Sequence, residues 1–529
     1  RQALFSGRRM FGGSRFPCRR TGRPAARKRA RLAAVVATVL LAAGGARPAF
    51  AAVPSPLWGR LANPGLRGLR IKTTLFFAGQ ARDGTNPYHC SKTPGRNLAL
   101  FTVMPADNRH LAWSESRENR DFALKAMARA GINVVAMSSW GEDFLPCVES
   151  WEPSAPMQTA PASHEELFDA AGRASLLVMP FIESRGNWNL RNEFPRWTDG
   201  RVAPGAVSQV VNLVTRCLKN AAHPEWADRW ARVYDSAGNA RYAVVLIHAS
   251  SNRIGAEDHA AFAQGFDLMA QAVLEATGVT VGFFIDALPP DSNAPGVYRP
   301  SAAAAGPFLR GTASILGLQC FIPEIWMRGA PTEAQRLAWK RAFSAGWVDA
   351  GIPFLMDVCP GYDAHLVFPR SVIYGLTDSW RAALTRMAAE FGRGGLAYNS
   401  WNGYTEAMTG VPLRPEDGGD RCYEWLRGLA SRPFMRGDVN ADRLVDIADA
   451  VCVLGYLFGG AGEPCKISVP RCLESADASD DGRVDLADAI VILAYLFQGI
   501  ARLPAPFGAC GLDPTPDDLG CLSYPPCGE

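Results

Sequence analysis

The chain has 529 residues, of which 48% are apolar and 20% are charged, so it can bury a large core and is too long for one ordinary domain. Its formal net charge of +4 comes mainly from a basic cluster near the start of the chain, formed by Arg8, Arg9, Arg19, Arg20, Arg27, Lys28, Arg29 and Arg31. Because the rest of the chain is close to neutral, a nucleic-acid-binding surface is not expected.

The basic cluster is followed by an export signal pattern. Residues 32–43 form an apolar stretch of about twelve residues, shorter than the roughly twenty that a bilayer span needs. The small-residue pattern Ala49-Phe50-Ala51 follows. Residues 1–51 are therefore predicted to be a signal peptide cleaved after Ala51, and the mature chain is expected to be secreted or bound to the cell surface, with no membrane span. An uncleaved membrane anchor is the alternative. Residues 52–67 are predicted to be a linker.

From residue 68 to 430, short apolar runs alternate with amphipathic stretches. The runs have no polar alternation, as expected of parallel strands buried on both faces, and they cover residues 71–77, 132–137, 176–182, 242–247, 279–285, 315–322, 352–356 and 396–398. Helical patterns cover residues 120–130, 261–276, 333–345 and 379–391. Gly131, Gly278 and Gly351 each stand between a helix pattern and the next strand, where a left-handed helix cap is expected.

Eight strands alternating with helices predict an α/β fold, a (β/α)8 TIM-type barrel over residues 68–430. A doubly wound open sheet is the competing architecture, but the sequence has no Gly-rich phosphate loop to support it. No cofactor is expected in the barrel. A Ser nucleophile would need a G-x-S-x-G elbow and a zinc hydrolase an H-E-x-x-H motif, and neither is present.

In TIM-type barrels the chemistry lies where strands end. Five carboxylates stand at those positions and are the candidate catalytic residues, namely Glu183, Asp286, Glu324, Asp357 and Glu406. Cleavage of a glycosidic bond needs one carboxylic acid to protonate the departing oxygen and a second group to stabilise or attack the sugar. Aromatic side chains that could stack on sugars lie in or near the same loops, namely Trp140, Trp188, Trp326, Tyr362, Trp401 and Tyr404.

The most specific barrel motif is Tyr398-Asn399-Ser400-Trp401-Asn402-Gly403-Tyr404-Thr405-Glu406. It resembles the strand-eight signature W-N-E-W-x-E-G of barrels related to endo-α-mannosidases and α-1,3-glucanases, including uncharacterised bacterial relatives. Trp401, Asn402 and Glu406 match, and Gly403 stands where the first Glu is expected. The resemblance implies that Glu406 is the general acid/base.

A partner for Glu406 must come from another strand, and Asp357 or Asp286 is preferred. Residues 357–365 are dense in polar groups and contain Gly and Pro, which is typical of a loop that lines a site. The residues expected to bind substrate are Trp140, His248, Tyr362, Asp363, His365, Asn399, Trp401, Asn402 and Tyr404. We expect a glycoside hydrolase acting on a polysaccharide or glycan. The alternative is a non-catalytic glycan-binding or scaffold-associated barrel.

A duplicated acidic loop follows the barrel. The first copy offers oxygen ligands at loop positions 1, 3, 5, 9 and 12, and the second copy repeats this pattern thirty-nine residues later. The ligands of the first loop are Asp438, Asn440, Asp442, Asp446 and Asp449. Those of the second loop are Asp477, Ser479, Asp481, Asp485 and Asp488. Each loop runs into an apolar helix pattern, over residues 450–458 and 489–497. Calcium prefers six to eight oxygen ligands in such a loop, so two Ca²⁺ sites are predicted.

The repeats resemble the loop-helix units of type I dockerins over residues 434–500, and the resemblance implies attachment to a cohesin-like or cell-surface protein. Arg443 stands at position 6, where Gly is usual, and a left-handed Arg would cost roughly 1–2 kcal/mol, so the first site is expected to bind more weakly. The tail could instead brace the barrel. Six of the thirteen cysteines lie after residue 450, some of them in a Cys-rich segment at 501–529. Disulfides are expected among these six, and no pairing is assigned.

Overall fold

The computed structural model describes residues 53–77, 101–111, 116–139, 161–183, 203–247, 259–286, 296, 298–327, 329–366, 369–430, 432–459, 472–499, 502–515, 519, 521 and 524–527. The predicted signal peptide, residues 1–51, lies outside these ranges. Within them, no helix is both long and apolar enough to cross a membrane.

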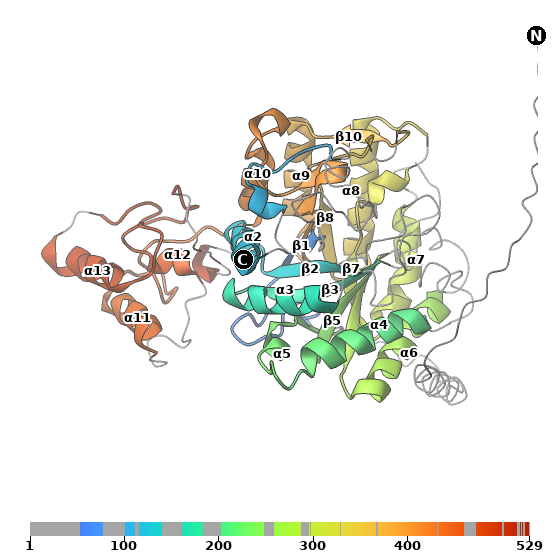
Figure 1. The fold of residues 1–529 in the computed structure, drawn as a ribbon, viewed down its shortest axis with the longest axis horizontal. Helices are drawn as coiled ribbons and strands as arrows, with labels where there is room; N and C mark the ends of the chain where they lie inside the picture. The colour runs from blue at the N-terminus through green and yellow to red at the C-terminus, as the bar shows by residue number, and fades with distance from the viewer. Residues whose placement is uncertain are drawn as a thin grey trace, which may run out of the picture. The chain divides into compact units, whose positions relative to one another are not determined.

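Eight parallel strands close into a ring, which confirms the predicted (β/α)8 barrel (Figure 1). In chain order the strands are β1 (Ile71–Phe76), β2 (Val134–Ser139), β3 (Leu177–Glu183), β5 (Ala240–Ile247), β6 (Val281–Ile285), β7 (Ile315–Gln319), β8 (Phe354–Val358) and β11 (Gly395–Tyr398). Pairing of β3 with β5 and of β1 with β11 completes the ring. The short strand β4 (Arg232–Tyr234) pairs antiparallel with β5 and lies outside the eightfold ring. All eight strands overlap the apolar runs in the sequence.

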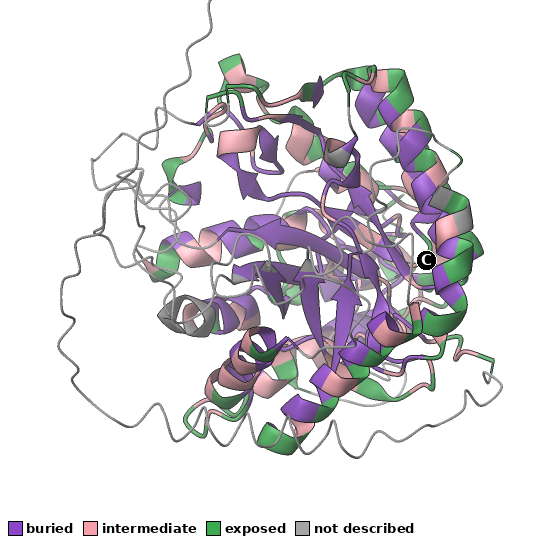
Figure 2. Cartoon of the chain, turned by 90° about the vertical axis from the view of Figure 1, so that its right-hand side faces the viewer, coloured by how far each residue is buried: buried purple, intermediate pink, exposed green. Residues whose placement is uncertain are grey.

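Helices follow the strands and cover the barrel from outside. They are α2 (Arg117–Arg129), α3 (Pro161–Arg173), α4 (Pro204–Leu213), α5 (Trp226–Arg229), α6 (His259–Thr277), α7 (Tyr298–Arg310), α8 (Glu333–Asp349), α9 (Asp378–Phe391) and α10 (Arg421–Ala430). The glycines predicted to cap helices are left-handed, with φ of 80° at Gly131, 70° at Gly278 and 69° at Gly351. Figure 2 shows the central strands fully buried, while the helices bury one face and expose the other.

Two apolar layers fix which strand residues face the inside of the barrel. One cluster contains Leu75, Phe284 and Leu355 and fills the interior, and the other packs the outer strand faces against the helices. Because side chains alternate along a strand, outward Met356 and Val358 place Asp357 on the inside. The same alternation turns the residues that follow β6 and β11 inward, so polar groups lie above an apolar interior at the carboxyl ends of the strands.

The segment predicted to be a linker is part of the barrel. Leu61 is fully buried in the interior cluster and pairs with Val233 of β4. The indole nitrogen of Trp58 donates to the carbonyl of Ile315, at a distance of 3.0 Å. The sequence pattern gave no sign of this packing, since residues 52–67 contain no continuous apolar run of strand length.

The C-terminal region is built around two similar helices, α11 (Ile447–Phe458) and α13 (Leu486–Gln498), with the short helix α12 (Leu473–Ala476) before the second loop. Its core is small and contains Val439, Val453, Ala478 and Ile492. Two disulfides, Cys472–Cys521 and Cys510–Cys527, close this region, and Cys452 is disulfide-bonded as well. The disulfides among the described residues therefore lie in a region whose own buried core is small.

Candidate active site

Glu406 lies in a tight hairpin directly after β11. The two arms, β12 (Asn402–Gly403) and β13 (Met408–Thr409), pair antiparallel, and the turn of 3-10 helix Tyr404–Glu406 connects them. Ala407 closes the turn with a left-handed φ of 54°, a conformation that costs roughly 1 kcal/mol for a residue with a Cβ. The hairpin thus fixes Glu406 at the carboxyl end of the barrel.

The carboxyl of Glu406 is half-buried and has the properties of a proton donor near neutral pH. Burial raises its pKa from 4.5 to about 7, and a hydrogen bond from the Tyr362 hydroxyl, at 3.4 Å from Oε1, opposes that rise. A glutamic acid with this pKa is protonated in about half of the molecules at pH 7, which is the condition a general acid needs.

Asp357 and Glu324 belong to a buried charge cluster centred on Lys340. The Lys340 ammonium pairs with Glu324 at 2.7 Å and with Asp357, and all three side chains are at most 1% exposed. Burial alone would lower the pKa of Lys340, but the two carboxylates outweigh it and raise the pKa above its usual value. Burial raises the pKa of Asp357 to about 6, against the pull of Lys340 and of a hydrogen bond from Asn399.

One face of α8 carries this cluster. The helix begins at a capping box between Thr332 and Gln335, and Arg336, Lys340 and Ser344 follow at intervals of four residues. Arg336 donates to the carbonyl of Glu324, 2.6 Å away. Lys340 was not among the predicted site residues. Its spacing from Arg336 on an otherwise apolar helix face is the sequence signal that could have identified it.

A stack of two tyrosines lies between Glu406 and the Lys340 cluster. Tyr362 of β9 (Gly361–Asp363) stacks on Tyr374 of β10 (Ile373–Gly375), with ring centroids 6.0 Å apart and planes 17° apart. Tyr362 donates to Glu406, and the Tyr374 hydroxyl lies 3.4 Å from Oε1 of Glu324. The chain of contacts brings Glu406, Tyr362, Glu324 and Asp357 into one region. Asp363 and His365, which hydrogen-bond to each other at 2.6 Å, follow on the same loop.

Other predicted residues take buried positions near this region. Asp286 follows β6 and is fully buried, as is Asn399, whose amide donates to Asp357 while its carbonyl oxygen has no hydrogen-bond partner among the described residues. Gln319, at the end of β7, was not predicted. Both polar atoms of its amide are buried without a partner in the described part of the chain. An unpaired buried amide has donor and acceptor capacity left for a ligand.

Three residues of the strand-eight motif pack in the interior of the protein. Trp401 is 1% exposed and contacts His110, with ring centroids 6.0 Å apart. Tyr404 is fully buried beside Phe101. Asn402 exchanges two hydrogen bonds of 2.9 Å with the backbone of Phe77 at the end of β1. Asn402 thus connects the segment after the last strand to the end of the first, and the burial of all three side chains favours a structural role over contact with a sugar.

The position expected to carry the first Glu of the motif has no room for a side chain. A Cβ at Gly403 would meet Oγ of Ser400 at 2.6 Å and the carbonyl oxygen of Met408 at 2.7 Å. Trp140, Trp188 and His248 lie outside the described residues, as do the side chains of Glu183, the last residue of β3, and Trp326.

The two acidic loops of the C-terminal region share one hydrogen-bond pattern. In each, the Asp at position 1 accepts from the backbone N–H groups of positions 5 and 6, as Asp438 does from Asp442 and Arg443, both at 3.0 Å. The Asp at position 12, Asp449 or Asp488, accepts from the N–H of position 3 and of position 9. Position 9, Asp446 or Asp485, caps the following helix in a capping box. Sequence repetition therefore extends to the backbone.

Backbone angles confirm that position 6 is left-handed in both loops. The φ angle is 76° at Arg443 and 78° at Gly482. Position 4 is left-handed too, with φ of 58° at Ala441 and 61° at Asp480. The sequence of the loops did not predict this conformation at position 4. The first loop therefore holds two strained side-chain-bearing residues and the second holds one.

Metal geometry is less complete than the ligand spacing suggests. In the described ranges, which include both loops, no group of three or more His, Cys, Asp or Glu side chains is arranged to hold a metal ion. Asp442 accepts instead from Leu444 N–H at 2.9 Å and from the Asn440 amide at 2.9 Å. The position-5 side chains Asp442 and Asp481 are exposed, so they would have to turn toward position 1 to complete a calcium shell.

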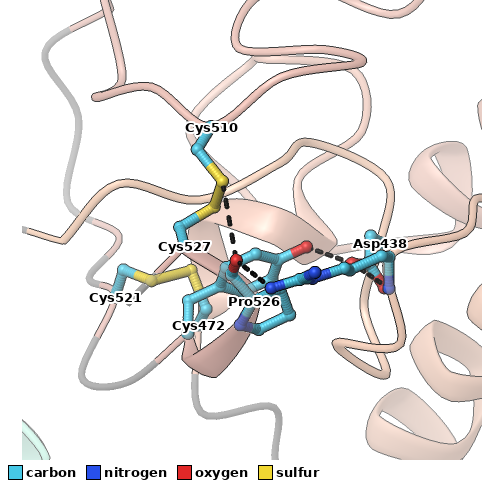
Figure 3. The surroundings of a disulfide bond; sticks show 8 residues. Asp438, Cys472, Cys510, Cys521, Pro526 and Cys527 are labelled. Atoms are coloured by element: carbon cyan, nitrogen blue, oxygen red, sulfur yellow. Dashed lines mark hydrogen bonds between the residues drawn. A yellow bond between two sulfur atoms is a disulfide. The ribbon is translucent and has the colours of Figure 1, made fainter. Parts of the chain in front are cut away.

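The Cys-rich segment covers the first loop. Figure 3 shows the two disulfides, Pro526 and Asp438. The carboxylate of Asp438 accepts a hydrogen bond from the Tyr524 hydroxyl. Arg443 donates to the carbonyl of Pro526, 3.0 Å away. Arg436, which precedes the first loop and is fully buried, pairs with Asp480 of the second loop and with Asp513 of the Cys-rich segment, each at 2.8 Å. None of these hydrogen bonds and ion pairs follows from a local sequence pattern, because the partners are 44 or more residues apart.

Comparison with known proteins supplies similarity of fold alone. No family model and no curated protein matches the chain. Among solved structures, the GH99 endo-alpha-mannosidase from Bacteroides thetaiotaomicron is 14% identical and aligns over 68% of this chain and 97% of its own, with a TM-score of 0.43. The exo-beta-1,4-mannosidase Op5Man5 from Opitutaceae bacterium strain TAV5 is 13% identical over 72% of this chain and 62% of its own, with a TM-score of 0.39.

The beta-mannanase from Streptomyces thermolilacinus is 15% identical over 62% of this chain and 91% of its own, with a TM-score of 0.33. The strand order and the closing pairs of this chain establish its architecture independently of these likenesses. The chain is a (β/α)8-barrel protein with a C-terminal region formed by a duplicated loop and helix.

Proposed function

We propose that the barrel is a glycoside hydrolase that acts on a polysaccharide or glycan, with Glu406 as the general acid/base. The single observation that carries this proposal is the state of Glu406, a carboxylic acid at the carboxyl end of a (β/α)8 barrel with a pKa raised to about 7 by burial. Its position in the strand-eight motif agrees with the role that the resemblance implies.

The second carboxylate in this proposal is Asp357. Lys340 and Asn399 both favour its ionised form, and its pKa of about 6 leaves it charged at neutral pH while Glu406 is still half protonated. Two carboxyl groups held in different protonation states supply what glycosidic cleavage requires, a proton for the leaving oxygen and a negative group for the positively charged sugar. Tyr362 is then a positioning residue that holds Glu406 through its hydroxyl.

The test is release of new reducing ends from a panel of α-glucans, mannans and host glycans by the full chain. Release that disappears in the Asp357→Asn variant, while the same variant still binds the polysaccharide, supports the assignment of Asp357. The Asp378→Asn variant is the matched control, because the Asp378 side chain is 85% exposed at the start of α9 and pairs with Arg381 of the same helix. Release that persists in Asp357→Asn would assign the second role elsewhere, to Asp286 first.

The second candidate function is a non-catalytic glycan-binding barrel. Gly403 favours it, because the backbone packing at this position excludes the carboxylate that the related signature carries. Tight binding of a polysaccharide with no release of reducing ends would establish this alternative. The same panel therefore separates the two candidates.

For the C-terminal region we propose two calcium sites and attachment to a cohesin-like or cell-surface protein, on an exported chain. The duplicated ligand spacing and the duplicated hydrogen-bond pattern support calcium, which would draw Asp442 and Asp481 inward. EDTA should lower the melting temperature of this region, and Asp481→Ala should reduce calcium affinity more than Asp442→Ala. Equal losses would show that the Arg443 backbone is no handicap, and an unchanged melting temperature would contradict calcium binding.

A further inference from the structure

The Cys-rich segment places a buried tyrosine on the first acidic loop. Tyr524 lies between two disulfide-bonded cysteines, Cys521 and Cys527. Its hydroxyl donates to Oδ2 of Asp438, the residue at loop position 1. The side chain of Tyr524 is 1% exposed and belongs to a small apolar cluster against which Ala441, at loop position 4, also packs. Ring and hydroxyl are therefore both fixed against the loop.

The two oxygens of the Asp438 carboxylate have different partners among the described residues. Oδ1 accepts one hydrogen bond, from the N–H of Asp442. Oδ2 accepts two, from the N–H of Arg443 and from the Tyr524 hydroxyl. A carboxylate oxygen has about two lone-pair sites, so both sites of Oδ2 are used and one site of Oδ1 is left. Oδ1 is therefore the oxygen of Asp438 that can bind a cation.

The second loop lacks this contact, although its sequence spacing is the same. Oδ2 of Asp477 accepts from the N–H of Gly482 at 3.0 Å, and Nη1 of Arg436 lies 3.8 Å from the same oxygen. Within the described ranges, no hydroxyl from outside the loop donates to Asp477. Tyr524 therefore acts on one of two otherwise similar loops, and the other loop is an internal reference for its effect.

We propose that Tyr524 is a positioning residue of the first calcium site, an inference that rests on the calcium binding proposed above for this region. Its hydroxyl holds Oδ2 of Asp438 and so fixes the orientation in which Oδ1 is left for the ion. Groups that hydrogen-bond to a metal-binding carboxylate orient it, and their loss weakens metal binding by about 10–100-fold. The first site then consists of the loop together with the Cys-rich segment, and the loop and helix alone are an incomplete site.

A disulfide connects this contact to the redox state of the segment. The carbonyl of Tyr524 accepts from the N–H of Cys527 at 3.1 Å, so both residues belong to one tight turn. Cys527 is bonded to Cys510, and this disulfide is drawn with Asp438 in Figure 3. Without it, the turn that carries Tyr524 loses one of its two covalent anchors. Loss of this disulfide should therefore weaken calcium binding by the first loop.

The experiment is calcium titration of the full chain by isothermal titration calorimetry, with one loop disabled at a time. In Asp481→Ala, which leaves the first loop intact, adding Tyr524→Phe should weaken calcium binding at least about tenfold. In Asp442→Ala, which leaves the second loop intact, the same addition should change the affinity by less than about twofold. Tyr495→Phe is the matched control, because it removes a tyrosine hydroxyl from α13, where the ring packs against Phe507.

The second loop separates positioning from a general loss of structure, which would weaken both loops alike. Circular dichroism confirms that each variant is folded. If Tyr524→Phe does not fold, the paired variant Cys510→Ser and Cys527→Ser decides, since it should weaken calcium binding in Asp481→Ala and leave it unchanged in Asp442→Ala.

An unchanged affinity of the first loop in Tyr524→Phe, or equal weakening of both loops, would overturn the role of Tyr524 and leave the proposed calcium sites in place. Calcium binding by Asp442→Ala but not by Asp481→Ala would also overturn it, because the first loop would then bind no calcium. Absence of calcium binding by the wild type would overturn this inference and the proposed sites together.

Discussion

Replacing Lys340 by Met tests the buried charge cluster most sharply. The substitution keeps the length and apolar character of the stem but removes the ammonium that lies between Glu324 and Asp357. Both carboxylates would then be left in a region from which water is excluded, since all three side chains are at most 1% exposed. Their mutual repulsion adds to the cost of burying each charge.

The expected loss is large. At the 2.7 Å separation of Lys340 and Glu324 and an effective dielectric constant of about 20, the attraction within that pair alone is about 6 kcal/mol. Proton uptake by the stranded carboxylates limits the loss, and removal of one partner of a buried ion pair costs about 3–5 kcal/mol. We therefore expect Lys340→Met to lower the free energy of unfolding of the barrel by about 3–5 kcal/mol at pH 8.

Urea unfolding, followed by tryptophan fluorescence at pH 8 and pH 5, measures this loss. It should be smaller at pH 5, because burial raises the pKa of Asp357 to about 6 and this carboxylate then takes up a proton. Adding Glu324→Gln and Asp357→Asn to Lys340→Met should recover more than half of the loss, since no buried charge is left. Lys125→Met, at an exposed position of α2, is the control and should change the free energy of unfolding by less than about 0.5 kcal/mol. A loss below about 1 kcal/mol in Lys340→Met would refute the reasoning.

Three further predictions concern Glu406, Tyr362 and the disulfides. Burial raises the pKa of Glu406 from 4.5 to about 7, so ionisation of Glu406 lowers the stability of the barrel progressively between these pH values and fully above pH 7. Glu406→Gln should therefore stabilise the barrel by up to roughly 3 kcal/mol at pH 8 and not at pH 4. Equal effects at both pH values would contradict this. If Glu406 donates the proton, kcat/KM falls as pH rises through about 7. Tyr362→Phe removes a hydrogen bond that lowers the pKa of Glu406, so this fall in kcat/KM should move to higher pH. A move to lower pH would exclude the proposed contact. A disulfide that closes a longer loop stabilises a fold more. Loss of Cys472–Cys521, which spans 49 residues, should therefore destabilise the C-terminal region by about 4 kcal/mol, and loss of Cys510–Cys527, which spans 17, by about 3 kcal/mol. Thermal unfolding of paired Cys→Ser variants measures both losses, and the reverse order would contradict the dependence on loop length.

The barrel could be predicted because its signal is local. A strand buried on both faces needs an uninterrupted apolar run, and a helix that ends before such a strand needs a residue tolerant of positive φ, as Gly131 and Gly278 are. Both requirements appear as residue types in sequence order. The segment at residues 52–67 failed this test, because Leu61 contributes to the interior through pairing with β4, more than 170 residues away.

The site could be predicted only in part. Strand ends identified Asp357, Glu324 and Glu406 correctly as neighbours of the barrel's carboxyl end, since strand position alone determines this. The protonation and exposure of these carboxylates depend on partners from elsewhere in the chain. Lys340 lies on the following helix, where its four-residue spacing from Arg336 is the one local signal. Likewise, motif matching made Trp401 a candidate for sugar binding, while the fold packs it in the buried layer between the strands and the helices.

The C-terminal region shows the same division. Ligand spacing and the left-handed backbone at Arg443 are local properties and could be predicted. The fully buried Arg436, which pairs with Asp480 and Asp513, could not, because its partners lie 44 and 77 residues further along the chain. Disulfide pairing likewise depends on distances that only the folded chain defines.

Release of reducing ends by Glu406→Gln, compared with the wild type on a glycan that the wild type cleaves, is the most direct measurement. Glutamine keeps the shape of the side chain and its hydrogen bond with Tyr362 but cannot donate a proton in catalysis. A general acid/base contributes about 10²–10⁴-fold, so release should fall by at least a hundredfold while binding of the glycan is retained. Full activity in Glu406→Gln would show that the proton comes from another group.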